Sequence, residues 1–311
     1  MKLTGIFASI PTPFDHRGDL YTTKIQQNVG RWNRTSLSGY LVCGAAGEGG
    51  LLTLDEKVQV WEQVAAAAKS DATLLAATGA ESVRETVTLS DRAAEIGYTA
   101  VVIAPPRCVA GVGRGPGMLR VYYQSVADAS RVPVIVENSA DGPDRRLSTE
   151  PLRVLAQHPN IIAVRQGADS SRAGDSPGRV SPTGYLSPSA RVRSMDSESS
   201  ELQILAGDAC GLVASLDAGA CGAILDFAAA VPFLCLSAEE AVRTRQAEAA
   251  KELQGLMAHP ARALATQYGI AGLKFAMDLQ GYYGGSPRLP GLPINADGKK
   301  HIENLFREIS G

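Results

Sequence analysis

Two side chains of opposite charge stand at the ends of neighbouring apolar segments, where an active site could form. Glu137 ends the run Pro133–Glu137, and Arg165 ends the run Ile161–Arg165. An arginine can bind a substrate carboxylate through two parallel hydrogen bonds, and a carboxylate beside it can act as a base. The alternative is a buried ion pair in which the two charges satisfy each other, because an unpaired buried charge is costly. Both interpretations place Glu137 beside Arg165.

Three further carboxylates stand at or near the ends of apolar runs. Glu48, Asp208 and Asp226, together with Glu137, could offer the oxygen ligands that divalent cations prefer. No histidine accompanies them, and their spacing matches no ligand motif. We therefore expect neither a metal nor a cofactor, and we assign Asp208 and Asp226 to substrate binding.

Histidine and cysteine give no catalytic signal. His158 and His259 each precede a proline at a predicted helix end, and none of the four histidines follows a predicted strand. Cys108 stands beside Arg107, but no paired base accompanies it. The five cysteines are scattered without CxxC spacing, and Met1–Ile6 lacks the apolar segment of a signal peptide. These observations predict a reduced, cytoplasmic protein.

The elements that would position these side chains alternate along the chain. Eight short runs rich in Val, Ile, Leu and Ala are separated by amphipathic stretches such as Leu54–Lys69, Ser82–Ile96 and Met118–Ala129. Runs that are apolar on successive residues are typical of parallel strands covered on both faces. Eight strands with alternating helices predict a (β/α)8 TIM barrel, whose active site lies at the carboxyl ends of the strands. The alternative is an open doubly wound sheet, but no GxGxxG motif or P-loop follows any strand. The runs are Gly5–Ile10, Gly39–Cys43, Thr73–Ala77, Ala100–Ala104, Pro133–Glu137, Ile161–Arg165, Leu202–Ala206 and Ala220–Leu225.

Two regions depart from this alternation. The segment Ser170–Ser200 is rich in Ser, Gly and Pro, which predicts a loop inserted near the barrel mouth. After about residue 237 the pattern is helical, over Ala238–Met257, Arg262–Asp278 and Lys299–Glu308. We therefore expect a barrel over residues 1–236 and a C-terminal helical extension over residues 237–311.

The composition narrows the classes of partner. The net charge is −2, and Lys and Arg are dispersed, so the chain lacks the basic stripe of a nucleic-acid-binding protein. The apolar runs are too short or too amphipathic to span a membrane. We expect no nucleic-acid partner and no membrane association.

Short motifs follow the predicted strands in a fixed order. They are Pro11-Thr12-Pro13-Phe14, Gly44-Ala45-Ala46-Gly47-Glu48, Ala77-Thr78-Gly79, Pro159-Asn160-Ile161-Ile162, Ala206-Gly207-Asp208, Ala218-Gly219-Ala220-Cys221-Gly222 and, towards the C-terminus, Tyr268–Lys274 followed by Gly281–Gly285. Together these motifs resemble the dihydrodipicolinate synthase / N-acetylneuraminate lyase family of pyruvate-handling aldolases, and the resemblance runs from Gly5 to about Pro293. The C-terminal motifs are most similar to the 4-hydroxy-2-oxoglutarate aldolase branch.

The sequence departs from the family pattern at the positions that carry its chemistry. The Schiff-base lysine of the family matches Arg165, whose delocalised guanidinium is a poor nucleophile and is not expected to form an imine. The proton-relaying tyrosine matches Glu137, in the pair Glu137-Asn138, and an ionised carboxylate donates no proton. None of the eight lysines lies between the fourth and eighth predicted strands, so the nucleophile has not moved to a neighbouring position.

The loop that holds the pyruvate carboxylate in the family has also changed. Its hydroxyl side chains match Ala45 and Ala46, which leaves the backbone N–H groups and the Glu48 side chain. We expect catalytic roles for Glu137 and Arg165. The predicted substrate-binding residues are Gly44, Ala45, Ala46, Gly47, Glu48, Asn138, Asp208 and Asp226.

Two functions remain open at this point. One is a lyase-family enzyme that acts on a small 2-oxo acid or another carboxylate without an imine. The other is a catalytically silent relative that binds a metabolite or a partner, or serves as an assembly subunit. In either case the resemblance implies a homo-oligomer, a dimer or a tetramer.

Overall fold

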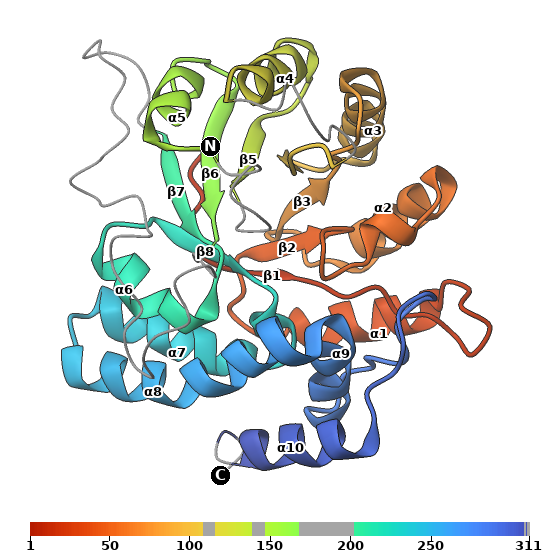
Figure 1. The fold of residues 1–311 in the computed structure, drawn as a ribbon, viewed down its shortest axis with the longest axis vertical. Helices are drawn as coiled ribbons and strands as arrows, with labels where there is room; N and C mark the ends of the chain where they lie inside the picture. The colour runs from red at the N-terminus through yellow and green to blue at the C-terminus, as the bar shows by residue number, and fades with distance from the viewer. Residues whose placement is uncertain (108–115, 139–146, 168–201, 308, 310–311) are drawn as a thin grey trace.

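Eight parallel strands close into a barrel at the centre of the molecule (Figure 1). The computed structural model describes residues 1–107, 116–138, 147–167, 202–307 and 309. Each strand pairs with its neighbours in chain order, and β1 pairs with both β2 and β8. The predicted (β/α)8 barrel is confirmed, and each predicted strand is found to within two residues at each end. The strands are β1 Gly5–Ser9, β2 Gly39–Val42, β3 Thr73–Ala77, β4 Ala100–Ile103, β5 Val134–Asn138, β6 Ile161–Gln166, β7 Gln203–Ala206 and β8 Gly222–Leu225.

Side chains alternate between two apolar layers because successive residues of a strand point to opposite faces. Inside the barrel, one side chain or more from each strand packs into a small cluster, and the residues between them pack outward against the helices. A residue that stands two positions from an inner-cluster residue on the same strand therefore points into the barrel, and its direct neighbour points outward. The inner cluster comprises Leu3, Phe7, Leu41, Leu75, Ala100, Val102, Ile135, Ala163, Leu205 and Ile224.

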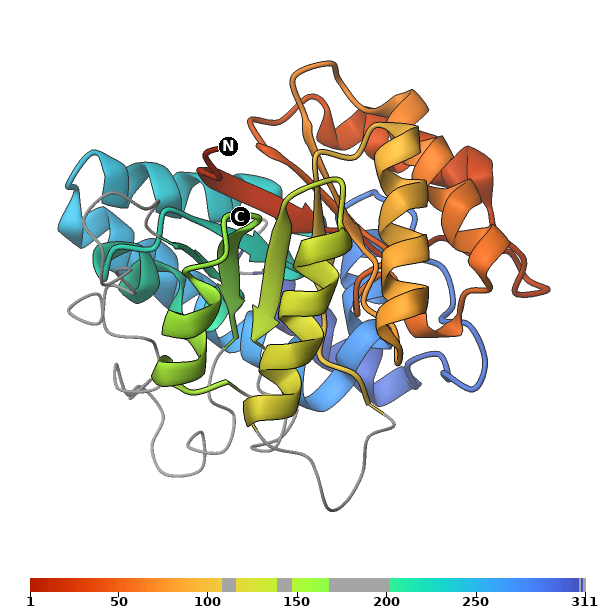
Figure 2. The same cartoon turned by 90° about the horizontal axis from the view of Figure 1, so that it is seen from above.

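Helices surround the barrel, as Figures 1 and 2 show. The start of α2 carries a capping box, in which Thr53 and Glu56 each accept a hydrogen bond from the other's backbone N–H. Ser82 caps α3, and Gly97 ends it with a φ of 106°. These local signals explain why the predicted helix boundaries here agree with the structure. The helices between strands are α1 Thr22–Trp32, α2 Leu54–Ala67, α3 Val83–Ile96, α4 Pro116–Ala129, α5 Thr149–Leu155, α6 Leu212–Asp217 and α7 Pro232–Arg243, with 3-10 turns η1 Gly49–Leu51, η6 Ala209–Gly211 and η7 Phe227–Ala229.

The C-terminal helices differ from the prediction in where they break. The predicted helix Ala238–Met257 is wrong, because Arg245, with a φ of 59°, separates α7 from α8. The predicted helix Arg262–Asp278 is also interrupted, by a stretch of π-helix that separates α8 from α9. His259 consequently lies inside α8 rather than at a helix end. These elements are α8 Ala247–Ala263, η8 Leu264–Tyr268, α9 Gly269–Leu279 and α10 Ala296–Arg307.

The division of the chain at residues 236 and 237 remains a prediction, and α7 runs across it. In Figure 1 the C-terminal helices lie along one side of the barrel, beside α1 and α7. The predicted insertion Ser170–Ser200 lies outside the described residues, as does Cys108. Over the part of the chain that is described, no helix has the length and apolar character needed to cross a membrane.

Candidate functional site

Arg165 and Glu137 form a buried ion pair at the carboxyl ends of β6 and β5. They are register partners, and each stands two residues beyond an inner-cluster residue of its strand, so both point into the barrel. Arg165 Nη1 donates to Glu137 Oε2 at 3.0 Å, and the side chains are 9% and 10% exposed. A third charge joins them, since Arg165 Nη2 donates to Asp226 Oδ1 at 3.3 Å. The predicted contact between Glu137 and Arg165 is therefore present.

Most of the Arg165 guanidinium is occupied by the protein itself. Besides the two carboxylates, Nε donates to the carbonyl of Ile224 at 3.0 Å, and Nη2 lies 3.4 Å from the carbonyl of Gly207. Burial alone would lower the pKa of Arg165, but the charges of Glu137 and Asp226 outweigh it and raise the pKa above its ordinary value. The guanidinium is therefore a permanent cation held on several sides. A bidentate clamp for a substrate carboxylate would require one of these partners to be displaced.

The segment Gly44–Glu48 forms a tight loop after β2. Glu48 adopts a φ of 53°, and a Cβ at Gly49 would lie 1.9 Å from the carbonyl oxygen of Cys43, so the backbone is closely folded on itself. The hydroxyl of Thr12 donates to the carbonyl of Gly47 at 2.6 Å. Ala46 and Gly47 are buried, and within the described residues their N–H groups meet no acceptor. These two N–H groups can therefore donate to a ligand or to water.

Glu48 is directed away from the substrate role expected of it. Its carboxylate forms an ion pair with the fully buried Lys274, at 2.5 Å from Oε1 to Nζ, and Oε2 accepts from the backbone N–H of Arg288 at 2.8 Å. Burial lowers the pKa of Lys274, and the charge of Glu48 opposes that shift. Lys274 also lies 4.5 Å from the centre of the Phe14 ring. Glu48 therefore ties the loop to α9 and to the C-terminal segment.

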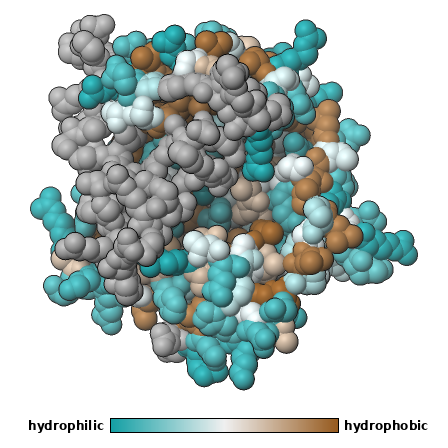
Figure 3. Space-filling model, viewed as in Figure 1, coloured by the Kyte–Doolittle hydropathy of each residue, from teal (hydrophilic) through white to brown (hydrophobic). Residues whose placement is uncertain are grey.

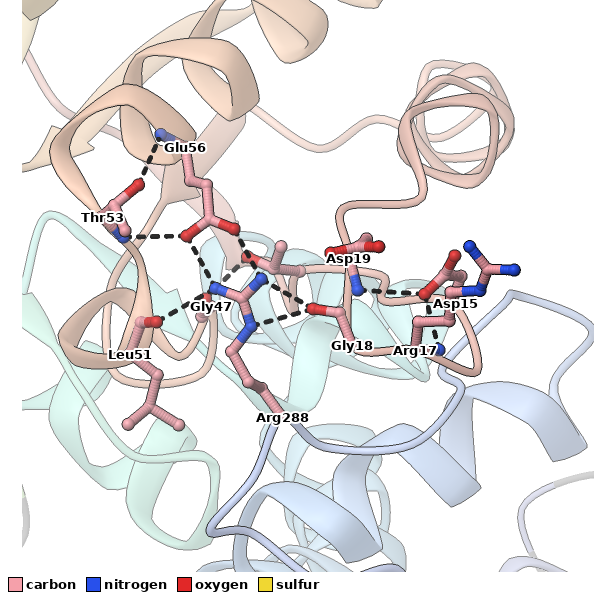
Figure 4. Close-up of polar contacts among 10 residues, drawn as sticks. Asp15, Arg17, Gly18, Asp19, Gly47, Leu51, Thr53, Glu56 and Arg288 are labelled. Atoms are coloured by element: carbon pink, nitrogen blue, oxygen red, sulfur yellow. Dashed lines mark hydrogen bonds and ion pairs between the residues drawn. The ribbon is translucent and has the colours of Figure 1, made fainter.

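Arg288 continues this connection between distant parts of the chain (Figure 4). Its guanidinium makes two hydrogen bonds to the carboxylate of Glu56, at 2.5 and 2.7 Å, and donates to the carbonyls of Gly18 and Leu51. The side-chain hydrogen bond from Arg288 lowers the pKa of Glu56 to about 2. One arginine thus holds together the turn before α1, the start of α2 and the C-terminal segment.

Two other predicted binding residues have structural partners. The amide of Asn138 exchanges hydrogen bonds with the backbone of Leu147 and donates to Gln166 Oε1 at 2.9 Å. Asp208 caps the turn η6 through the backbone N–H of Cys210, and burial raises the pKa of its carboxyl. The structure thus brings Glu137, Arg165 and Asp226 together. It gives Glu48 and Asn138 other contacts. In the described residues no group of three or more His, Cys, Asp or Glu side chains could hold a metal ion.

A cavity of about 420 Å³ opens at the barrel mouth over these residues. This mouth cavity is lined by Glu137, Arg165 and Asp226, by Gly44 and Ala45 of the loop, and by residues following β3 and β4. Figure 3 shows that the middle of this face is recessed. The volume lies within the range typical of small-molecule sites.

Lys57 on α2 also lines the mouth cavity, and it is not among the site residues predicted from the sequence. It is partly exposed, and its ammonium makes no hydrogen bond or ion pair with any residue that the structure describes. Lys57 comes before the fourth strand, outside the stretch between the fourth and eighth strands where a displaced lysine would be expected. The only available signal was its position one turn into a helix that follows a strand end.

A charged cavity at the carboxyl ends of the strands of a (β/α)8 barrel is the common arrangement of barrel enzymes. The family model for the dihydrodipicolinate synthetase family matches residues 2–309, and the chain belongs to that family. The family predicted from the sequence motifs is therefore confirmed.

Individual relatives resemble the chain over most of its length. The 4-hydroxy-tetrahydrodipicolinate synthase of Methanothrix thermoacetophila is 24% identical over 98% of this chain and 97% of its own. The N-acetylneuraminate lyase of Rhizobium meliloti is 34% identical over 53% of this chain and 54% of its own. Among solved structures, dihydrodipicolinate synthase DapA-2 from Bacillus anthracis has a TM-score of 0.85 at 20% identity, and covers 99% of both chains. At that identity the structural match supports the fold alone.

Proposed function

We propose that this member of the dihydrodipicolinate synthetase family binds a small 2-oxo acid or a related carboxylate in the mouth cavity, without forming the imine used by the lyases it resembles. The observation that carries the proposal is the position of Arg165. A guanidinium paired with two carboxylates occupies the floor of the cavity where the family's lysine is expected.

Two features of the cavity support a carboxylate as the occupant. Lys57 lines the cavity, and its ammonium has no partner among the described residues, so it can attract an anion electrostatically. The backbone N–H groups of the buried residues Ala46 and Gly47 have no acceptor among the described residues and can donate to a carboxylate. In this proposal Glu137 acts as a base, and Arg165 provides positive charge near the reacting carbonyl.

The second candidate is a catalytically silent protein with a metabolite-binding or assembly role. The observation that favours it is the extent to which Arg165 is already paired, since a group that satisfies four protein acceptors has little left to offer a substrate. A homo-oligomeric state, dimer or tetramer, and a cytoplasmic location are part of both candidates and rest on the family resemblance and on the cysteine pattern.

The test combines trapping with titration. Borohydride reduction in the presence of pyruvate, followed by intact-mass measurement, should give no adduct on the wild-type protein, while a family member that carries the lysine serves as the positive control. An adduct that disappears in Lys57→Met would place a reactive amine on α2 and overturn the imine-free part of the proposal. Isothermal titration with pyruvate and with 2-oxoglutarate tests whether the mouth cavity binds a 2-oxo acid, and the absence of binding would overturn the first candidate. A turnover assay on the acid that binds separates the two candidates, since turnover supports the first and binding without turnover supports the silent protein.

A further inference from the structure

A second cavity of about 260 Å³ adjoins the mouth cavity on the side of the C-terminal helices. The two cavities share Ala45, Gly207 and Asp226 as lining residues, so they meet at the carboxyl ends of β2, β7 and β8. We call this second cavity the side pocket.

The walls of the side pocket are apolar. They come from Phe227 of η7, from Leu264 and Ala265 of η8, and from Ile270 and Leu273 of α9. Asp208 and Asp226 are the ionisable side chains that line it among the described residues. Asp226 is directed to Arg165, and Asp208 to the turn η6. The rest of the pocket wall can pack against an organic ligand but makes no hydrogen bonds to it from side chains.

The backbone of this wall departs from regular α-helix. Leu264–Tyr268 form a stretch of π-helix, and Gly269 follows with a φ of 56°. A Cβ at Gly269 would meet no atom within 4 Å, so its backbone conformation rather than a lack of space requires glycine. Short π-helical stretches are uncommon and frequently occur at functional sites. Here the stretch places Leu264 and Ala265 on the wall of the pocket.

We propose that the side pocket holds the apolar tail of a 2-oxo acid whose carboxyl end lies in the mouth cavity, and that the tail is about the size of a benzene ring. The inference rests on the proposed function, because the mouth cavity supplies the site for the polar end. An apolar cavity of about 150 Å³ is sufficient to bind benzene in an engineered protein. The side pocket is larger than that, and it opens toward the cations of the mouth cavity rather than being sealed.

The experiment compares pyruvate, 4-methyl-2-oxopentanoate and phenylpyruvate by isothermal titration of the wild-type protein. Burial of the aromatic ring lowers the free energy of binding, so phenylpyruvate should bind at least about tenfold more tightly than pyruvate. The affinity of 4-methyl-2-oxopentanoate should lie between the two. Ala265→Phe fills the pocket from an exposed position of η8, and should reduce the preference to less than about threefold. Gln267→Phe is the matched control, since Gln267 is exposed on the same stretch and does not line the pocket. It should keep the wild-type preference.

The outcomes separate this inference from the proposed function. If pyruvate binds as tightly as phenylpyruvate, the side pocket does not receive the tail, although the proposed function stands. A phenylpyruvate preference that persists in Ala265→Phe would also overturn the inference. If no 2-oxo acid binds at all, the proposed function fails, and the assignment of the pocket fails with it.

Discussion

The contact between Arg165 and Glu137 predicts a large energetic coupling between the two side chains. Replacing Arg165 by methionine leaves the Glu137 carboxylate, 10% exposed, without its cation, and removal of one partner of a buried ion pair costs about 3–5 kcal/mol of stability. Replacing Glu137 by glutamine costs less, about 1–2 kcal/mol, because the amide oxygen still accepts from Nη1 and Asp226 still balances part of the charge. The double substitution removes both charges. It should be more stable than the sum of the single effects predicts, by about 1–3 kcal/mol.

The assay is a double-mutant cycle of Glu137→Gln and Arg165→Met, with the free energy of unfolding taken from denaturant melts. The chain offers a matched control in the pair Arg92 and Glu95, which has the same 3.0 Å separation but side chains that are 60% and 50% exposed. The corresponding cycle of Arg92→Met and Glu95→Gln should show a coupling below about 0.5 kcal/mol. If the buried pair couples no more strongly than the exposed pair, then Arg165 is held mainly by Asp226 and the backbone carbonyls, and the reasoning about Glu137 is wrong.

Two further predictions test the site and its support. Arg165→Lys alone should give no measurable pyruvate aldolase activity. The neighbouring carboxylates favour the charged ammonium of a lysine over the neutral amine that attacks a ketone. Appreciable activity of this variant in a lyase assay would contradict the reasoning. The pKa of Glu56 is about 2 in the folded protein, below its ordinary value of 4.5. The stabilisation from its contact with Arg288 is therefore present above pH 4.5 and is lost as the pH falls towards 2. Urea melts between pH 6 and pH 3 should therefore show a smaller loss of stability in Arg288→Met than in the wild type, and equal losses would argue against the contact.

The barrel could be predicted from the sequence because its signals are local and repeated. Each strand is a short apolar run, and each of α2 and α3 begins at a capping residue that is recognisable in the chain. The pairing of Glu137 with Arg165 followed from the same logic, since consecutive parallel strands place their ends side by side. Alternation along β5 and β6 would also have predicted that both side chains point inward.

The rest of the site depends on contacts between residues that are far apart in the chain. Asp226 was expected near a strand end, but its contact with Arg165 crosses from β8 to β6 inside the barrel. Glu48 meets Lys274 only because α9 returns to the loop after β2, and no local pattern records that return. The break between α7 and α8 was missed for a simpler reason: it is formed at Arg245, with neither glycine nor proline to mark it.

The two charges Glu137 and Arg165 at the barrel mouth are physically linked, so they are considered together. Arg165 needs acceptors for its N–H groups, and a tyrosine at position 137 would supply one neutral oxygen where Glu137 supplies a charge. Conversely, Glu137 without Arg165 would be a buried carboxylate without its cation, so each residue stabilises the other. The proposal that the chain forms no imine rests on this pair, because a guanidinium held by two carboxylates keeps its proton and is a poor nucleophile. Among the described residues of the mouth cavity, Lys57 and the backbone of the Gly44–Glu48 loop are groups that can meet a ligand. In the proposed function, the loop and helix beside the strand ends recognise the carboxylate, and the side pocket sets the size of the ligand.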